Sequence, residues 1–91
     1  MRVMRDLEML QAHVWYSKIQ QVSIRGTPDI LLCLAGKFIA IEMKASETAK
    51  ISELQTYNLS KIQKAGGMAV VAYPENWENI YSYLTDIANK H

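Results

Sequence analysis

The sequence predicts an α/β fold, a small mixed sheet with flanking helices in the order α-β-β-β-α-β-α. Three observations predict it: apolar runs of strand length, stretches with apolar residues at helical spacing, and Gly- or Pro-containing turn signals between them. An antiparallel meander followed by a β-α-β unit makes a mixed sheet with helices packed on it. The 91 residues allow one domain, residues 1–91.

The N-terminal part of the chain predicts a helix and then a short strand. The helix is expected over Val3–Tyr16, because apolar residues recur there at spacings of four, three and four: Val3, Leu7, Leu10 and Val14. Ile19–Ile24 is a strand candidate, and the Arg-Gly-Thr-Pro sequence at 25–28 is a turn signal.

A hairpin is expected next. Ile30–Leu34 is continuously apolar, which predicts a strand buried on both faces, with Cys33 as a small core residue. Ala35-Gly36 forms the turn, and Phe38–Lys44 is the following strand, with alternating apolar positions.

The second half predicts a helix, a strand and a last helix. Ser52 and Gln55 have the spacing of a capping box, so a helix begins there, and Gly66-Gly67 ends it. Met68–Tyr73 is a buried strand, and Asn76 can cap the final helix. That helix carries one apolar stripe, formed by Trp77, Ile80, Tyr81, Leu84, Ile87 and Ala88.

Composition limits the possible classes of protein. Cys33 is the only cysteine, so no disulfide within the chain is possible and a reducing compartment is expected. No apolar run approaches the roughly 20 residues of a membrane span, and no targeting segment is recognisable, so we expect a cytoplasmic protein with no membrane partner. The net charge of +1 does not by itself indicate a nucleic-acid-binding protein.

The hairpin carries the residues that predict chemistry. With a two-residue turn, paired positions sum to 71, which sets Asp29 opposite Glu42; a longer turn would set Asp29 opposite Met43 or Lys44. Alternation puts Glu42 and Lys44 on one face of the strand. Two adjacent carboxylates repel each other unless a cation joins them, and oxygen ligands suit Mg²⁺ or Mn²⁺. A phosphate-ester hydrolase follows as an expectation.

The order of these motifs resembles a known nuclease family. Gly26-Thr27-Pro28-Asp29 leads one strand, Glu42-Met43-Lys44 ends the next, and Ser52-x-x-Gln55 opens a helix. This is similar to the PD-(D/E)xK nucleases with a restriction-endonuclease-like fold, and within them to the VRR-NUC (virus-type replication-repair nuclease) family. Many relatives have a basic or Gly-rich stretch before this motif; residues 20–25 here contain one basic residue.

The resemblance implies roles for individual residues. Asp29 and Glu42 would ligate the metal ion, with the Met43 main-chain carbonyl completing the site. Lys44 would be the catalytic lysine and Gln55 would face the site from the helix start. The first-helix acid of the family maps to Glu8, with Asp6 as the alternative.

The resemblance also implies a function. It is that of a stand-alone phage-type DNA endonuclease acting in the bacterial host cytoplasm, of a kind associated with four-way (Holliday) junctions. The small domain, its single predicted site and its slight basic surplus predict in addition a homodimer that cuts branched DNA. The last helix, with Trp77, Tyr81 and Tyr83, is a first expectation for the dimer interface. Two alternatives remain open: a restriction-like endonuclease with sequence preference, and a non-catalytic DNA-binding or protein-interaction module. Taken singly, Asp29 could be a turn residue, Gln55 a cap, and the remaining acids and lysine ordinary surface residues.

Overall fold

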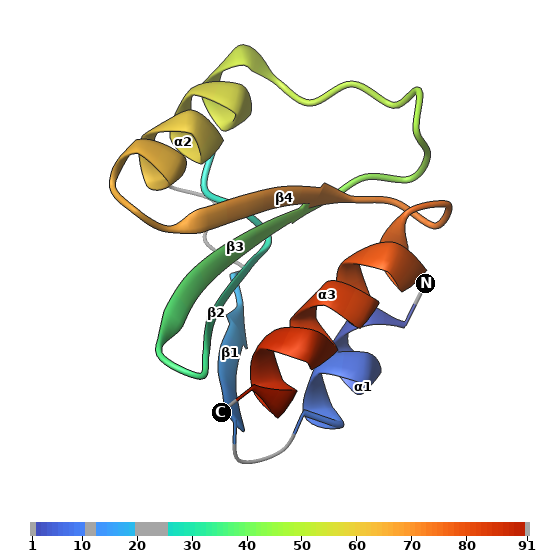
Figure 1. Cartoon of the computed structure of the whole chain (residues 1–91). Coiled ribbons are helices and arrows are strands. Elements are labelled where there is room, and N and C mark those ends of the chain that lie inside the picture. Colours follow the sequence, from blue (N-terminus) through green and yellow to red (C-terminus); the bar gives the residue numbers. More distant parts are fainter. Residues whose placement is uncertain (1, 11–12, 20–25, 91) are drawn as a thin grey trace.

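The computed structural model describes residues 2–10, 13–19 and 26–90. It confirms the predicted order α-β-β-β-α-β-α (Figure 1). The elements are α1 (Val3–Glu8), β1 (Val14–Lys18), β2 (Ile30–Leu34), β3 (Lys37–Met43), α2 (Glu53–Lys64), β4 (Met68–Ala72) and α3 (Trp77–Asn89).

The four strands form one mixed sheet in the order β1-β2-β3-β4. β1 and β2 are antiparallel, as are β2 and β3, whereas β4 runs parallel to β3. Leu34 pairs with Lys37 and Ile30 with Ile41, so the predicted register in which paired positions sum to 71 is confirmed. Ala35 and Gly36 both have positive φ angles, 50° and 85°, as a two-residue hairpin turn that follows the sheet twist requires.

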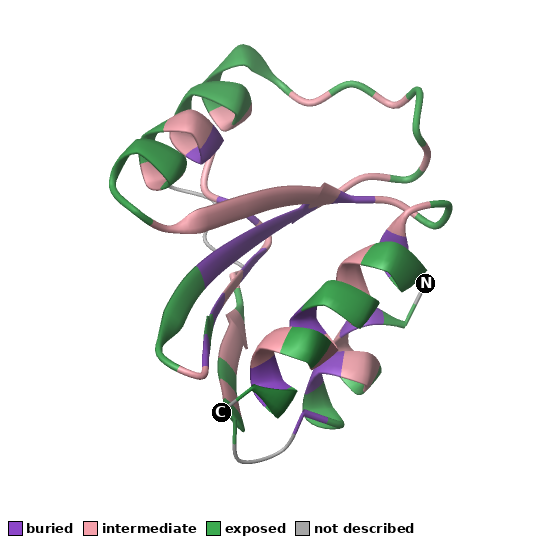
Figure 2. Ribbon diagram, viewed as in Figure 1, coloured by how far each residue is buried: buried purple, intermediate pink, exposed green. Residues whose placement is uncertain are grey.

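The helices cover the two faces of the sheet unequally. α1 and α3 lie on one face, and α2 lies on the other (Figure 1). The main core fills the space between the sheet and the α1–α3 layer; its fully buried side chains are Leu7, Ile30, Leu32, Leu34, Ile39, Ile41 and Leu84. α2 buries only Leu59, and most of its residues are exposed (Figure 2). The face under α2 is therefore the more accessible one.

The first helix is shorter than the sequence predicts. α1 ends at Glu8, and the predicted helix over Val3–Tyr16 is wrong from Val14 on, because Val14–Lys18 is strand β1; residues 11 and 12 lie outside the described part of the chain. Val14 and Tyr16 pack against the core at strand alternation, so pairing with β2 outweighs the helical spacing of the N-terminal apolar residues. Most of the predicted strand Ile19–Ile24 lies outside the described residues.

β2 is buried on one face only, which corrects the prediction for its central residues. Ile30, Leu32 and Leu34 are buried, but Leu31 is half-buried and Cys33 is exposed. Cys33 lies between Trp15 of β1 and Phe38 of β3, which are 67% and 47% exposed. α2 leaves this part of the sheet uncovered.

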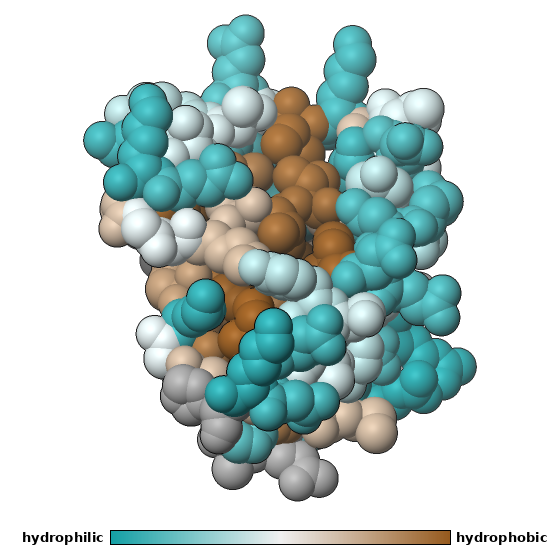
Figure 3. All heavy atoms as spheres, viewed as in Figure 1, coloured by the Kyte–Doolittle hydropathy of each residue, from teal (hydrophilic) through white to brown (hydrophobic). Residues whose placement is uncertain are grey.

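Two further expectations about burial change. β4 is not fully buried, because four of its five residues are half-buried. Figure 3 shows a band of hydrophobic residues on this side of the molecule, in the region where Figure 1 places β4. Trp77 is 5% exposed and belongs to the core, so it cannot form an interface, whereas Tyr83 on the same helix is 52% exposed. No helix in the described part of the chain is long and apolar enough to span a membrane.

Candidate active site

The two acidic residues of the hairpin lie at one end of the sheet. Asp29 directly precedes β2, and its Oδ2 accepts a hydrogen bond from the Met43 amide at 2.7 Å. Glu42 lies next to Met43 on β3, one residue beyond the Ile30–Ile41 pair, and Asp29 lies close enough for its charge to act on Glu42. The structure therefore brings Asp29 and Glu42 together, as the two-residue turn requires.

Glu42 is the only charged residue buried among the described ones. Its side chain is 4% exposed, and its Oε1 has no hydrogen-bond partner in the described part of the chain. Burial, followed by the negative charge of Asp29, raises the pKa of Glu42 from its ordinary value of 4.5 to about 7. A buried carboxylate oxygen without a donor is costly unless a cation or a proton joins it, so this oxygen fits a site for a positive ligand.

Gln55 fixes the other oxygen of Glu42. Its Nε2 donates to Glu42 Oε2 at 2.8 Å, and its Oε1 accepts from the Ser52 amide at 2.7 Å. The Ser52 hydroxyl in turn accepts from the Gln55 amide at 3.0 Å, completing the capping box at the start of α2. One side chain therefore both caps the helix and orients the carboxylate, and the predicted capping box is confirmed.

Lys44 follows β3 and has partners in the loop between β3 and α2. Its Nζ donates to the carbonyl oxygens of Glu47 at 2.6 Å and Ala49 at 3.0 Å. The ammonium also lies 5.1 Å from the centroid of the Tyr73 ring. Within the described residues, Lys44 makes no ion pair with Asp29 or Glu42, so the ammonium and the two carboxylates lie at the same end of the sheet without direct pairing.

Strand geometry places the Met43 carbonyl on the Asp29 side of β3. In an extended strand the amide and carbonyl of one residue point to the same side, and the Met43 amide points to Asp29. The donor set available to a metal ion is thus two carboxylates and a main-chain carbonyl. Among the described residues, no group of three or more His, Cys, Asp and Glu side chains is placed to hold a metal ion. An all-oxygen set with two acids fits Mg²⁺ or Mn²⁺, which retain waters and take phosphate oxygens.

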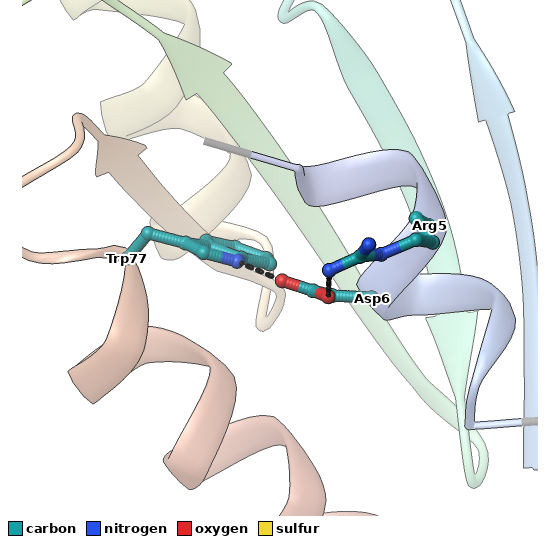
Figure 4. A network of polar contacts seen from close by, with 3 residues as sticks. All are labelled: Arg5, Asp6 and Trp77. Atoms are coloured by element: carbon teal, nitrogen blue, oxygen red, sulfur yellow. Dashed lines mark hydrogen bonds and ion pairs between the residues drawn. The ribbon is translucent and has the colours of Figure 1, made fainter.

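The two candidates for the first-helix acid have other partners. The Tyr16 hydroxyl donates to the Glu8 carboxylate, and Tyr16 packs on the α1–α3 face of the sheet, opposite to Glu42. Asp6 accepts from Trp77 Nε1 at 2.7 Å and lies 3.8 Å from an Arg5 nitrogen (Figure 4). Neither acid has a recorded contact with Asp29 or Glu42, and each has a structural partner instead.

Two contacts around the site involve residues that the sequence analysis did not single out. Asn58 Nδ2 of α2 donates to the Gly26 carbonyl at 2.9 Å and so holds the segment that leads to Asp29. Tyr73 follows β4 and contacts Lys44. The parallel register that pairs Met43 with Ala72 would have placed Tyr73 beside Lys44, had the sequence revealed the pairing of β3 with β4.

Comparisons of the chain with protein-family models, with characterised proteins and with solved structures returned no match. The geometry of these side chains is therefore the basis for a functional assignment.

Proposed function

We propose that this protein is a metal-dependent DNA nuclease that hydrolyses phosphodiester bonds with Mg²⁺ or Mn²⁺. One observation carries the proposal: Asp29 and Glu42 lie side by side, and one buried oxygen of Glu42 has no donor. The VRR-NUC resemblance of the sequence agrees with this assignment, and so does the PD-(D/E)xK fold that it implies.

Asp29, Glu42 and the Met43 carbonyl would hold the metal ion. When bound, the ion supplies Lewis-acid stabilisation of a phosphate and a nucleophilic water at neutral pH. Gln55 holds Glu42 in one orientation through the 2.8 Å hydrogen bond, and the Met43 amide does the same for Asp29. The two acids are thus fixed before any ligand arrives, which reduces the ordering needed on binding.

Lys44 would stabilise negative charge on the phosphoryl oxygens or orient the attacking water. In this role its ammonium has to leave the carbonyl oxygens of Glu47 and Ala49 and move toward the acids. The loop that supplies these carbonyls is tied at a second point, where the Glu47 amide donates to Glu75 at 3.3 Å. The same loop contacts give specific support to the second candidate function, a non-catalytic DNA-binding module, in which Lys44 keeps a structural role.

The DNA substrate that we propose is branched, with four-way junctions first. A two-fold dimer supplies two cutting sites and doubles the slight basic surplus of one chain, and a four-way junction needs paired cuts. Lys50, Lys61 and Lys64 are exposed on the loop and on α2, on the side of the sheet that carries the acids, and are available for phosphate contacts. A sequence-preferring restriction-like enzyme has no specific observation in its favour.

The deciding experiment uses purified wild-type protein and the variants Asp29→Asn and Asp86→Asn. Asp86 is an exposed acid on α3 and serves as the matched control. Labelled junctions, flaps and linear duplexes are incubated with Mg²⁺, Mn²⁺ or EDTA. We expect metal-dependent cleavage by wild type and Asp86→Asn, none by Asp29→Asn, and a preference for junctions. Wild-type cleavage by Asp29→Asn refutes the site, and metal-independent DNA binding without cleavage supports the non-catalytic module.

A further inference from the structure

The two edges of the sheet differ in how their outward backbone groups are used. The Ala72 carbonyl accepts from the Lys44 amide, so Ala72 directs its backbone groups toward β3. In a strand this direction alternates, so every second residue of β4 directs its amide and carbonyl away from β3. Side chains occupy several of these groups. Gln63 donates to the Ala69 carbonyl at 3.2 Å, and the Asn76 side chain both donates to the Val71 carbonyl at 2.9 Å and accepts from the Tyr73 amide at 2.8 Å.

The edge at β1 has no such protection among the described residues. The ladder to β2 includes the bonds from the Ala35 amide to the His13 carbonyl and from the Ile19 amide to the Asp29 carbonyl. The amides and carbonyls of the odd-numbered residues of β1 therefore point to β2. Those of Val14, Tyr16 and Lys18 point outward, away from β2. Within residues 2–10, 13–19 and 26–90, no hydrogen bond uses these outward groups. An open edge of this kind is a template for pairing with another strand.

We propose that the β1 edge is where two copies of this chain join, with the two β1 strands antiparallel about a two-fold axis at Tyr16. This inference assigns an interface to the dimer of the proposed function, and it does not require the chain to cut DNA. The axis at Tyr16 pairs Val14 with the partner's Lys18 and Tyr16 with the partner's Tyr16. All three outward residues then exchange hydrogen bonds, about six in total.

The side chains of β1 are self-complementary in this arrangement. Val14 and Tyr16 pack on the α1–α3 face, so alternation puts Lys18 on that face too. The partner's Lys18 then lies diagonally next to Tyr16, whose hydroxyl holds the exposed carboxylate of Glu8. Each two-fold copy repeats this opposite-charge contact. On the other face, Trp15, which is 67% exposed, lies opposite the partner's Ser17 and loses part of its contact with water.

The arrangement also sets the geometry of the two active sites. A two-fold axis perpendicular to the sheet keeps both sets of acids on the same face, the one that carries α2. Strand spacing of ~4.8 Å and a rise of ~3.4 Å per residue put the two Glu42 side chains roughly 30 Å apart across an untwisted sheet. In this flat-sheet approximation both sites face the same side, where a single DNA molecule can reach them.

Site-directed cross-linking tests the interface without metal or DNA. In a Cys33→Ser background, Tyr16→Cys puts two sulfur atoms at the axis, where paired Cα atoms ~5.5 Å apart allow a disulfide. Lys18→Cys is the matched control, because its two copies would lie roughly 14 Å apart, four residues out of register. We expect at least tenfold more dimer from Tyr16→Cys than from Lys18→Cys on mild oxidation. Equal yields, or a dimer that neither variant cross-links, overturn the interface.

A charge-exchange series tests the same contact in solution. Lys18→Glu sets two carboxylates together at both symmetry-related contacts, and the dimer dissociation constant from sedimentation equilibrium should rise about tenfold or more. Adding Glu8→Lys should restore dimerisation, which a purely local effect on β1 would not do. A monomeric wild type, or a double variant no better than Lys18→Glu, refutes the proposal. Neither result bears on cleavage by Asp29 and Glu42, so the two proposals fail independently.

Discussion

Replacing Glu42 by Gln should stabilise the protein in a pH-dependent way when no metal ion is present. Glutamine has nearly the same shape and can keep the hydrogen bond from Gln55 through its carbonyl oxygen. It has no charge, so it avoids the repulsion from Asp29 and the desolvation that together raise the pKa of Glu42 to about 7. The variant therefore isolates the free energy stored at the site.

The magnitude and its sign follow from the pKa. Below pH 4.5, Glu42 is protonated in the folded and unfolded states, and its titration has no effect on stability. Between pH 4.5 and about 7 the folded state keeps a proton that the unfolded state has lost, so wild-type stability falls as pH rises. At about 1.4 kcal/mol per pH unit, the full loss above pH 7 is on the order of 3 kcal/mol. The other carboxylates titrate alike in both proteins. The free energy of unfolding of Glu42→Gln should therefore exceed that of wild type by about 2–3 kcal/mol at pH 8.

Urea denaturation followed by circular dichroism at pH 4 and pH 8, in EDTA, measures this difference. The free energies of unfolding should nearly coincide at pH 4, and at pH 8 the variant's should be higher by about 2–3 kcal/mol; in a thermal melt at pH 8 this corresponds to a midpoint roughly 10–20 °C higher. Adding Mn²⁺ at pH 8 should stabilise wild type and leave Glu42→Gln nearly unchanged, because in the proposed site the ion would bind the ionised carboxylate. A stability difference that is the same at both pH values would show that Glu42 is not destabilised by its charge, and the reasoning would fail.

Four further results are expected. Lys44→Ala should keep Mn²⁺ binding, measured by calorimetry, but lose about 10²–10³-fold in cleavage rate. Loss of metal binding in this variant at unchanged stability would contradict a purely catalytic role of Lys44. Ca²⁺ should support DNA binding with little cleavage. Gly26→Ala should lower the free energy of unfolding, measured by urea denaturation, by about 2–4 kcal/mol. The φ angle of Gly26 is +80°, and the added Cβ would lie 2.6 Å from Leu54 Cγ. An unchanged free energy of unfolding would contradict this packing. Cys33 should react with a thiol reagent in the folded state at a rate close to that of the unfolded chain, since it is exposed; protection until unfolding would contradict that exposure.

The parts of the fold set by short-range rules could be predicted from the sequence. The Ala35-Gly36 turn requires positive φ angles, and its two-residue length then sets the register that brings Asp29 to Glu42. The capping box at Ser52 and Gln55 also depends only on local spacing, and both of its hydrogen bonds are present. For the same reason the pair of acids was predictable, because it needs nothing beyond one hairpin.

Features that depend on tertiary contacts could not be predicted in the same way. The helical spacing of Leu7, Leu10 and Val14 is real, yet Val14 joins a strand because β2 offers it a partner. The exposure of Cys33 depends on how far α2 extends over the sheet, which no local pattern reveals. The partners of Lys44 are carbonyl oxygens in a loop, and any loop residue could have supplied them.

The side chain of Asn76 has a consequence for how large an assembly this sheet can build. An open sheet edge favours unlimited growth, because every strand that adds presents a fresh edge to the next molecule. Here the amide of Asn76 takes up both an acceptor and a donor of β4, and Gln63 takes up another acceptor. A pair joined through β1 would present only these partly capped β4 edges at its two ends. Growth beyond eight strands would then be disfavoured, so the closed pair rather than a fibril would be the end point of association.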